Sequence, residues 1–346
     1  MSEITERTPQ AVSPGGSAGG GPSPLRTALG VLGRQRELTV FVVAVVLLLY
    51  FGIRYNSTFV SQTNLSNLLS ETAAPIIVIA IGEVFLLICG EIDLSAGFVY
   101  TFAPFLMHYL IDFYGWPAWP AIIAGLLFGA VVGWFNGFLT VTMGLPSFIT
   151  TLGTGFILLG LTLTTSHAYP ANVPASSVGI GRWLGAAPWS QFIIAVILTV
   201  IFYIVLTRTK WGLHTIATGG NQLGAREAGI KTGRIKYGNF MLTSTLGALV
   251  GLQTAWYVNT IDPSAGGYQP MFYAVTAAVI GGTAMLGGQG TILGAFLGGI
   301  VLATLINGLN VAGVSANPLD IVFGLAILLS MIANVRLARL RAAGRN

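Results

Sequence analysis

Long apolar runs separated by short polar stretches are the main pattern in this chain. Ten runs, most of 16 to 24 residues, cover positions 38–53, 72–90, 98–111, 118–141, 147–165, 191–207, 237–258, 271–286, 291–309 and 318–335. An α-helix needs about 20 mainly apolar residues to cross the roughly 30 Å hydrocarbon core of a bilayer. The pattern therefore predicts an all-α polytopic membrane protein with about ten transmembrane helices.

The composition supports the same class of protein. The chain is 54% hydrophobic and 8% charged, whereas soluble domains average about 25% charged residues. Its 46 glycines follow no three-residue period, which excludes a collagen-like chain and favours close packing of helices and broken helices. Contact with a lipid bilayer is therefore expected over much of the surface.

The first thirty residues differ from the rest. They are polar and contain the stretch PGGSAGGGPSP, without the basic and then apolar layout of a cleaved signal peptide. Such a composition cannot bury a core. We expect a disordered cytoplasmic tail at 1–30 and one transmembrane domain at 31–346.

The distribution of basic residues predicts the orientation in the membrane. With ten spans and both ends on one side, fourteen of the sixteen Lys and Arg residues fall on that side, and only Arg54 and Arg182 fall on the other. Because Lys and Arg concentrate in cytoplasmic loops, both termini and the loop 208–236 are expected in the cytoplasm. Charges placed at membrane boundaries also argue against a nucleic-acid partner.

On the opposite side, the stretch 166–190 holds three prolines and two tryptophans. Tryptophan is enriched at membrane interfaces, and proline favours turns. This composition predicts a short structured segment lying at the external surface.

The loop 208–236 is the only long polar interruption between the apolar runs. It carries six basic residues and a single acid, Glu227. Asn221 is a good N-cap for a helix of about two turns over 222–228, and Gly229 suits the left-handed position that ends a helix. Because so short a helix is marginal alone, we expect it to dock on a partner surface. The alternative is an ordinary basic loop that only sets the topology.

Two sets of four runs, the second to the fifth and the seventh to the tenth, lie on either side of this loop and the run before it. Residues 80–97 (AIGEVFLLICGEIDLSAG) and 279–296 (VIGGTAMLGGQGTILGAF) share an apolar run, a glycine-containing break and a Leu-small-Ala restart. Internal repeats of this kind are typical of transporters. The pattern predicts a repeat of spans 2–5 and 7–10, with a chance match of glycines as the alternative.

Acidic residues mark the second run and the break after it. Glu83 lies inside the run, where a carboxylate must face the protein interior, a polar cavity or a donor. It is a candidate pathway or gating residue, or alternatively an acid that only holds helices together. The break is assigned to Gly90, Glu91, Asp93 and Gly97, and Asp93 is expected to cap the helix that starts near residue 94.

Several uncharged residues in or near the runs complete the candidate pathway. Asn136, Gln253 and Asn307 are amides in apolar surroundings, and Phe148 opens the run 147–165. Interior-facing amides can bind hydroxyl-rich solutes or hydrogen-bond neighbouring helices, and packing is the expected role for any one of them.

No catalytic or metal-binding pattern occurs in the sequence. The motifs G-x-S-x-G, H-E-x-x-H and G-x-x-x-x-G-K-[ST] are absent, Cys89 is the single cysteine, and the three histidines are scattered. We therefore expect neither an enzyme nor a metal site, and any ATP with its Mg²⁺ has to be bound and hydrolysed on another chain.

Four segments, found in this order, resemble the membrane permeases of bacterial sugar ABC importers of the ribose/xylose type. They are GEIDLSAG at 90–97, NGFLTVTMGLPSFITTLGT at 136–154, ATGGNQLGAREAGIKTGRIKYGNF at 217–240 and AVIGGTAMLGGQGTILGAFLGG at 278–299. The resemblance covers nearly everything after about residue 35.

The resemblance implies an inner-membrane permease subunit with a fold similar to that of the vitamin-B12 importer. Such permeases pair, usually as homodimers, dock on cytoplasmic ABC ATPase subunits and receive a monosaccharide from a periplasmic sugar-binding protein. In this family the matching loop contains a coupling helix that fits a groove on the ATPase. Its residues here would be Gly219, Asn221, Arg226, Glu227 and Gly229. The competing hypotheses are a proton-coupled secondary transporter that uses Glu83 and a non-transporting membrane scaffold or lipid-modifying enzyme.

Overall fold

The computed structural model describes residues 36–314 and the single positions 321, 324, 325, 328 and 332. The expected tail at 1–30, most of the tenth apolar run at 318–335 and the basic residues after it lie outside this part of the chain.

The described residues are almost entirely helical. The helices are α2 (Arg36–Arg54), α3 (Asn56–Phe59), α4 (Gln62–Ser66), α5 (Ala74–Ile88), α6 (Ala96–His108), α7 (Ala118–Gly137), α8 (Ser147–Ser166), α9 (Ala175–Gly181), α10 (Ser190–Arg208), α11 (Lys210–Gly220), α12 (Gln222–Glu227), α13 (Thr232–Val258), α14 (Tyr268–Ile280) and α15 (Ile292–Val311). Short π-helical turns extend four of them: η1 (Asn67–Ala73), η2 (Tyr109–Phe113), η3 (Phe138–Thr142) and η4 (Arg182–Ala186). The all-α class is confirmed.

Within the described residues, six helical stretches are long and apolar enough to cross a membrane: 37–54, 62–88, 118–142, 147–166, 190–208 and 292–311. The total of ten spans stays a prediction. One expected run differs from the structure, since 271–286 is helical only to Ile280, where α14 ends. The chain then turns at Gly282, Gly287 and Gly288, whose positive φ angles cannot continue a helix.

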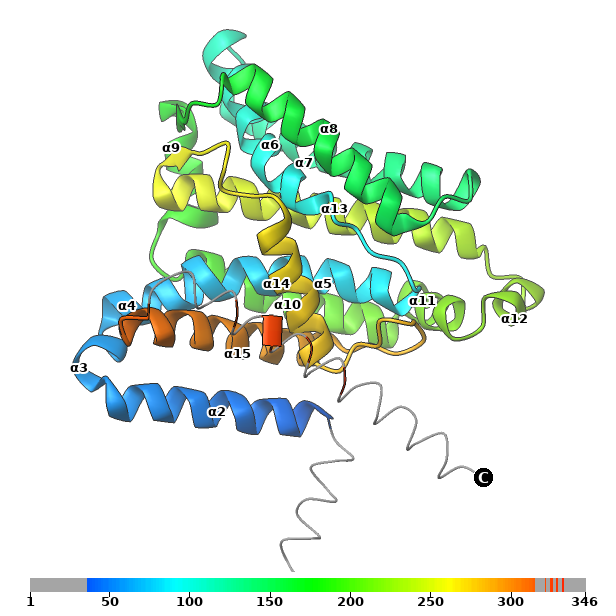
Figure 1. Ribbon diagram of the computed structural model, residues 1–346. Coiled ribbons are helices and arrows are strands. Elements are labelled where there is room, and N and C mark those ends of the chain that lie inside the picture. Colours follow the sequence, from blue (N-terminus) through cyan, green and yellow to red (C-terminus); the bar gives the residue numbers. More distant parts are fainter. Residues whose placement is uncertain (1–35, 315–320, 322–323, 326–327, 329–331, 333–346) are drawn as a thin grey trace, which may run out of the picture. The chain divides into compact units, whose positions relative to one another are not determined.

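The helices form a layered bundle (Figure 1). α2 and α8 lie on opposite sides, and α15, α5 and α13 lie between them. α11 and α12 lie together at one end of the bundle, whereas α3, α4 and α9 lie at the other end. The loop that joins α14 to α15 reaches back toward α11.

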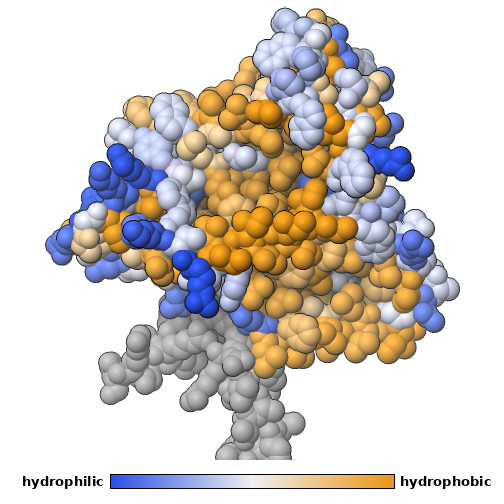
Figure 2. All heavy atoms as spheres, turned by 180° about the vertical axis from the view of Figure 1, so that it is seen from behind, coloured by the Kyte–Doolittle hydropathy of each residue, from blue (hydrophilic) through white to orange (hydrophobic). Residues whose placement is uncertain are grey.

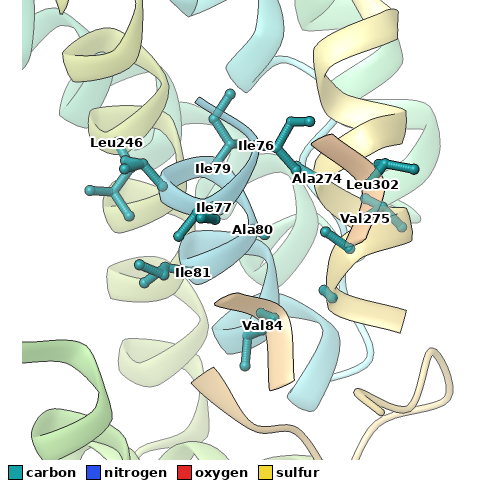
Figure 3. Close-up of a cluster of buried hydrophobic side chains, with 14 of the residues drawn as sticks. Ile76, Ile77, Ile79, Ala80, Ile81, Val84, Leu246, Ala274, Val275 and Leu302 are labelled. Atoms are coloured by element: carbon teal, nitrogen blue, oxygen red, sulfur yellow. The ribbon is translucent and has the colours of Figure 1, made fainter. Parts of the chain in front are cut away.

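Helix α5 forms the centre of the main hydrophobic core. Its residues Ile77, Ile79 and Ile81 are fully buried, and α10, α13, α14 and α15 pack around it. Figure 3 shows Ile76 to Val84 of this helix beside Leu246 of α13, Ala274 and Val275 of α14 and Leu302 of α15. A helix that is apolar all round is expected in such a place, because no face of it needs water.

The most extensive contact between two described helices is the one between α7 and α13. Gly125, Gly129, Gly133 and Gly137 recur every fourth residue along α7, so they lie on one face of that helix. The last three lie directly against the backbone of α13, where a side chain has no room. Lipid tails are as apolar as leucine, so close backbone packing through small residues replaces the hydrophobic effect as the force between membrane helices.

The surface carries the pattern of a protein that sits in a bilayer. Figure 2 shows a broad apolar face, with polar residues gathered toward its two edges. Exposed apolar side chains come from several outer helices, among them Val46, Leu127, Ile157 and Ile197. Half or more of each of these side chains is exposed, as is expected for apolar residues that face the hydrocarbon chains of a bilayer.

The structured segment predicted at 166–190 is confirmed. It contains α9, η4 and the strand β1 (Ala171–Asn172), which pairs antiparallel with β2 (Thr260–Ile261) after α13. The Trp256 indole of α13 donates a hydrogen bond of 3.2 Å to the Ser177 hydroxyl. This end of the bundle is thereby fixed to α13.

Candidate functional site

The polar loop 208–236 folds into two helices rather than one. The expected short helix is present as α12, and the Asn221 side chain accepts a hydrogen bond of 2.9 Å from the Gly224 amide, as an N-cap should. The preceding helix α11 was not predicted. It begins behind Thr209, whose hydroxyl accepts from the Gly212 amide, and this cap was a signal that the sequence contained.

The end of α12 also follows its local sequence. Gly229 has φ of +83°, and the Ile230 amide donates to the Ala225 carbonyl at 2.9 Å. A left-handed residue followed by a bond reaching back five residues is the usual way in which glycine closes a helix. Asn221 and Gly229 therefore define the two ends of a single rigid element.

The side chains of α12 are turned mainly outward. Glu227 is exposed, and Leu223 keeps 68% of its surface accessible despite being apolar. Arg226 is exposed too, but its Nε donates to the Thr232 hydroxyl at 3.1 Å, at the start of α13. The outer face of α12 thus combines one acid, one base and one large apolar side chain.

An amide that the sequence analysis did not single out connects α11 to the bundle. Asn239 of α13 is fully buried, and its Oδ1 accepts from the Trp211 indole of α11 at 2.9 Å. Its Nδ2 donates to the Phe85 carbonyl of α5 at 3.1 Å. The signal available in the sequence was an amide inside the apolar run 237–258, a position at which membrane helices use polar side chains to bind one another.

The predicted break after the second apolar run is present. α5 ends at Ile88, α6 begins at Ala96, and Gly90, Glu91 and Asp93 lie between them. Gly97 instead lies inside the first turn of α6, where its carbonyl accepts a hydrogen bond of 2.9 Å from the Gly267 amide. The break is therefore shorter than the motif GEIDLSAG suggested.

Asp93 is the centre of a buried hydrogen-bond network. Its Oδ2 accepts from the Ser244 hydroxyl of α13 at 2.6 Å, and its Oδ1 accepts from the Asn136 amide of α7 at 3.3 Å. Oδ1 also accepts from the hydroxyl and amide of Ser95, at 2.6 and 2.9 Å. The Thr154 hydroxyl of α8 donates to Asn136 Oδ1 at 2.7 Å. The carboxylate thus connects α7 and α13 to the break directly, and α8 through Asn136.

The expected capping role of Asp93 describes only part of this arrangement. Its Oδ1 accepts from the Ser95 amide at the start of α6, as a capping residue does, whereas Ser95 makes no side-chain capping bond of its own. Asp93 also bonds to α7 and α13, because the break lies inside the bundle and not at its surface. The sequence revealed the acid but not the helices that surround it.

Glu83 joins the same cluster. It is fully buried in α5, and its Oε1 accepts a hydrogen bond of 3.3 Å from the Asp93 amide. Together with Asn136, which is also fully buried, Glu83 was a candidate pathway residue. Both lie within packed protein, and neither lines the pocket described next.

A pocket of about 330 Å³ lies beside the break. Its walls come from the break, α8, α14 and the turn after α14, and include Glu91, Phe148, Phe272, Val275 and Met285. The volume falls in the range of small-molecule sites, about 300–1,000 Å³. Most of the lining is apolar, and among the described residues that line the pocket Glu91 is the one charged side chain.

Glu91, in the wall of this pocket, forms an ion pair with Lys236. Its Oε1 lies 2.6 Å from Nζ of Lys236, near the start of α13, and the two side chains are only 13% and 12% exposed. Phe148, the third candidate pathway residue, is half exposed and lines the same pocket.

The two remaining candidates connect helices. Gln253 of α13 donates from Nε2 to the Leu184 carbonyl of η4 at 2.8 Å. Asn307 of α15 and Asn64 of α4 exchange two amide hydrogen bonds of 3.0 Å each. Each of the two amides thus hydrogen-bonds a neighbouring element, which agrees with the packing role expected for such residues. Among the described residues, no group of three or more His, Cys, Asp or Glu side chains could hold a metal ion.

Comparison with known proteins places this architecture in a family. Residues 64–331 match the family model described as branched-chain amino acid transport system / permease component. The xylose/arabinose import permease of Sulfolobus acidocaldarius is 35% identical over 305 residues, which cover 86% of this chain and 85% of that protein.

Two further relatives are also named as sugar import permeases. The ribose import permease of Bacillus subtilis is 33% identical over 87% of this chain and 93% of its own length. The fructose import permease of Rhizobium meliloti is 29% identical over 84% of this chain and 82% of its own length. No solved structure gives a significant match. The chain therefore belongs to the permease-component family of ABC importers, among the sugar import permeases.

Proposed function

We propose that this chain is the membrane-spanning permease subunit of a binding-protein-dependent ABC importer and that it carries a monosaccharide. The observation that carries the proposal is the capped helix α12, which lies at one end of the bundle with its polar and apolar side chains turned outward. Pentoses and fructose are the solutes named for the relatives, so a pentose or a related sugar is the proposed cargo.

In this proposal α12 is the coupling helix. Asn221 and Gly229 form its ends, Arg226 and Glu227 face a cytoplasmic ABC ATPase subunit, and Gly219 holds the preceding helix α11 against the end of α5. The ATPase subunit binds ATP and Mg²⁺ and hydrolyses the nucleotide. The charges of Arg226 and Glu227 would meet opposite charges on that subunit, and Leu223 would enter an apolar part of its groove. The permease itself has no catalytic task.

The remaining parts of the proposal follow from the sequence and its resemblance. The protein has about ten spans in a bacterial inner membrane, with a fold like that of the vitamin-B12 importer, an internal repeat of spans 2–5 and 7–10, and both termini in the cytoplasm. Its domains are the tail 1–30 and the transmembrane permease domain 31–346, with the coupling loop at 208–236. A periplasmic sugar-binding protein delivers the solute, and a second copy of the chain completes the pathway.

The pocket beside Phe148 and Glu91 is the proposed inner part of the solute pathway. It lies near the end of α5, and the last residue of α5 contacts both α11 and the turn that follows α14. Movement of the coupling segment, which consists of α11 and α12, therefore reaches the pocket through the backbone of Ile88, next to Leu87 in the pocket lining.

A proton-coupled secondary transporter is the alternative, with Glu83 as the proton carrier. Glu83 is fully buried and does not line the pocket, so this mechanism gains no pathway for its proton from the described residues. It also leaves the outward-facing helix α12 without a task.

The test is reconstitution in proteoliposomes with the partner ATPase and the sugar-binding protein, followed by uptake of labelled pentoses and fructose. We expect uptake that requires ATP and resists a protonophore. Replacing Glu227→Lys together with Gly229→Pro is expected to abolish uptake while the protein stays in the membrane. Normal transport by this double variant, or uptake that collapses with the proton gradient, contradicts the proposal.

A further inference from the structure

One face of α13 carries polar residues toward α5 and the break. Lys236, Asn239, Thr243 and Ser244 are spaced three, four and one apart, so they lie along one side of the helix. Each contacts the same neighbouring segment: Lys236 pairs with Glu91, Asn239 bonds to the Phe85 carbonyl, the Thr243 backbone lies against Gly82, and Ser244 bonds to Asp93. Residues 236–244 of α13 thus contact the segment 82–93 from one end of that segment to the other.

The position of Lys236 sets it apart from the other three. It lies in the first two turns of α13, and the helix starts at Thr232, to which Arg226 of α12 is hydrogen-bonded. Through this short connection, a displacement of α12 moves the start of α13. The Trp211 bond to Asn239 attaches α11 to the same part of α13.

The position of Glu91 is equally specific. It lies in the non-helical break between α5 and α6 and forms part of the wall of the 330 Å³ pocket. The break lies outside the regular hydrogen-bond ladders of α5 and α6, although the Glu91 amide donates to the Leu86 carbonyl at 3.0 Å. Residues outside a regular ladder shift more readily than helical ones when a partner pulls on them. The Glu91 carboxylate and the Lys236 ammonium ion form a short charge-assisted bond that is largely shielded from water.

We propose that the Glu91–Lys236 ion pair links the coupling segment to the wall of the solute pocket, so that loss of the pair separates ATP hydrolysis from sugar movement. Lys236 and Glu91 are positioning residues here, because neither needs to touch the sugar or the nucleotide. The inference deepens the proposed function and rests on it. It assigns to one pair of side chains the transmission of movement from α12 to the wall of the pocket.

The pair acts by passing a displacement from α12, through the start of α13, to the break. A displacement of α12 toward or away from the ATPase moves Lys236 with the start of α13. Because the pair is short and poorly hydrated, Glu91 follows and the wall of the pocket changes shape. Without the pair, the coupling segment still docks and still responds to ATP, but the break no longer receives the displacement.

The experiment uses the complete importer in proteoliposomes and measures ATP hydrolysed and labelled pentose imported in the same sample. The variants are Glu91→Gln, Lys236→Met and the charge-swapped pair Glu91→Lys with Lys236→Glu. For the single variants we expect ATP hydrolysis stimulated by the binding protein to continue, while sugar imported per ATP falls by about tenfold, within the usual range of coupling between two sites. The swapped pair is expected to restore most of the ratio.

The control is Asp112→Asn, which removes an acid that is paired with His108 on another part of the chain. It should leave the ratio unchanged. Parallel loss of ATP hydrolysis and uptake in the single variants, loss of assembly in them, or an unchanged ratio overturns the proposal, because the pair then only holds helices together or does nothing. Absence of ATP-dependent uptake in the unmodified complex contradicts the proposed function instead, so the two failures are distinguishable.

Discussion

The backbone of Gly219, next to the end of α11, lies against the carbonyl group of Ile88, the last residue of α5. That carbonyl also accepts a hydrogen bond of 2.8 Å from the Gly288 amide, in the turn between α14 and α15. Three segments far apart in the sequence therefore meet at one carbonyl group. A β-carbon on residue 219 would occupy the space of the Ile88 oxygen, so only glycine fits there.

The first prediction concerns this contact. Gly219→Ala is expected to push α11 away from α5 and to reduce sugar uptake by tenfold or more, on the order of the effect of a misplacement of about 1 Å in a working site. Uptake per unit of protein in the membrane is the measurement. Gly220→Ala is the matched control, because a β-carbon there meets no atom within 4 Å. Equal uptake by the two variants would show that the contact has no mechanical role.

The second prediction concerns the end of α12. Gly229→Ala places a side chain at φ of +83°, which costs about 1–2 kcal/mol in the left-handed region. The last turn of α12 should therefore fray, and amide hydrogen exchange in 225–230 should become faster. Gly229→Asn is the control, because asparagine tolerates this conformation. Slow exchange in the alanine variant would mean that contacts other than the cap hold the helix.

The third prediction concerns the network around Asp93. Asp93→Ala leaves the Ser244 hydroxyl and the hydroxyl and amide of Ser95 without their acceptor, whereas Asn136 keeps a bond of 2.7 Å to the Ser95 hydroxyl. Each buried donor left unpaired costs about 1–3 kcal/mol. The free energy of unfolding should fall by about 3 kcal/mol or more, which thermal or denaturant unfolding in detergent can measure.

Ser244→Ala removes a single bond to the carboxylate, so its loss of stability should be smaller, about 1.5–3 kcal/mol. A network that acts as a unit also predicts that the two losses do not add in the double variant. Similar and additive effects of the two substitutions would contradict the view of Asp93 as the centre of the network.

The fourth prediction separates packing from transport for Asn307. Its two hydrogen bonds to Asn64 connect α15 to α4, so a double-mutant cycle with Asn64→Ala and Asn307→Ala should give a coupling energy of about 0.6 kcal/mol, and up to about 1.7 kcal/mol. The apparent KM for sugar should change little in either single variant. A raised KM in Asn307→Ala alone would instead indicate contact with the solute.

Local features of the structure were predicted well from the sequence. Asn221 and Gly229 gave the start and end of α12, because a cap depends on the backbone within three or four residues of it. The apolar run 72–90 predicted a helix long enough to cross a membrane, and 62–88 is such a helical stretch, because length and hydrophobicity are local properties.

Features that depend on neighbours distant in the sequence were not predicted. α11 was expected as loop, since its polar and basic residues do not show that Trp211 and Thr215 bond to Asn239 of α13. Asp93 was expected only to cap a helix, since the positions of α7 and α13 are needed to show that Asn136 and Ser244 are also its partners.

The sequence by itself determined that this protein is helical, lies in a membrane and carries a capped polar helix between its apolar runs. Hydrophobic length, charge distribution and capping chemistry are properties of short segments, and they act before any helix has found its neighbour. Only the tertiary structure decided that Gly219 meets Ile88 and that Lys236 meets Glu91 at the wall of the pocket. Those contacts depend on which helices pack together, and small residues and single polar bonds set that packing in a lipid environment.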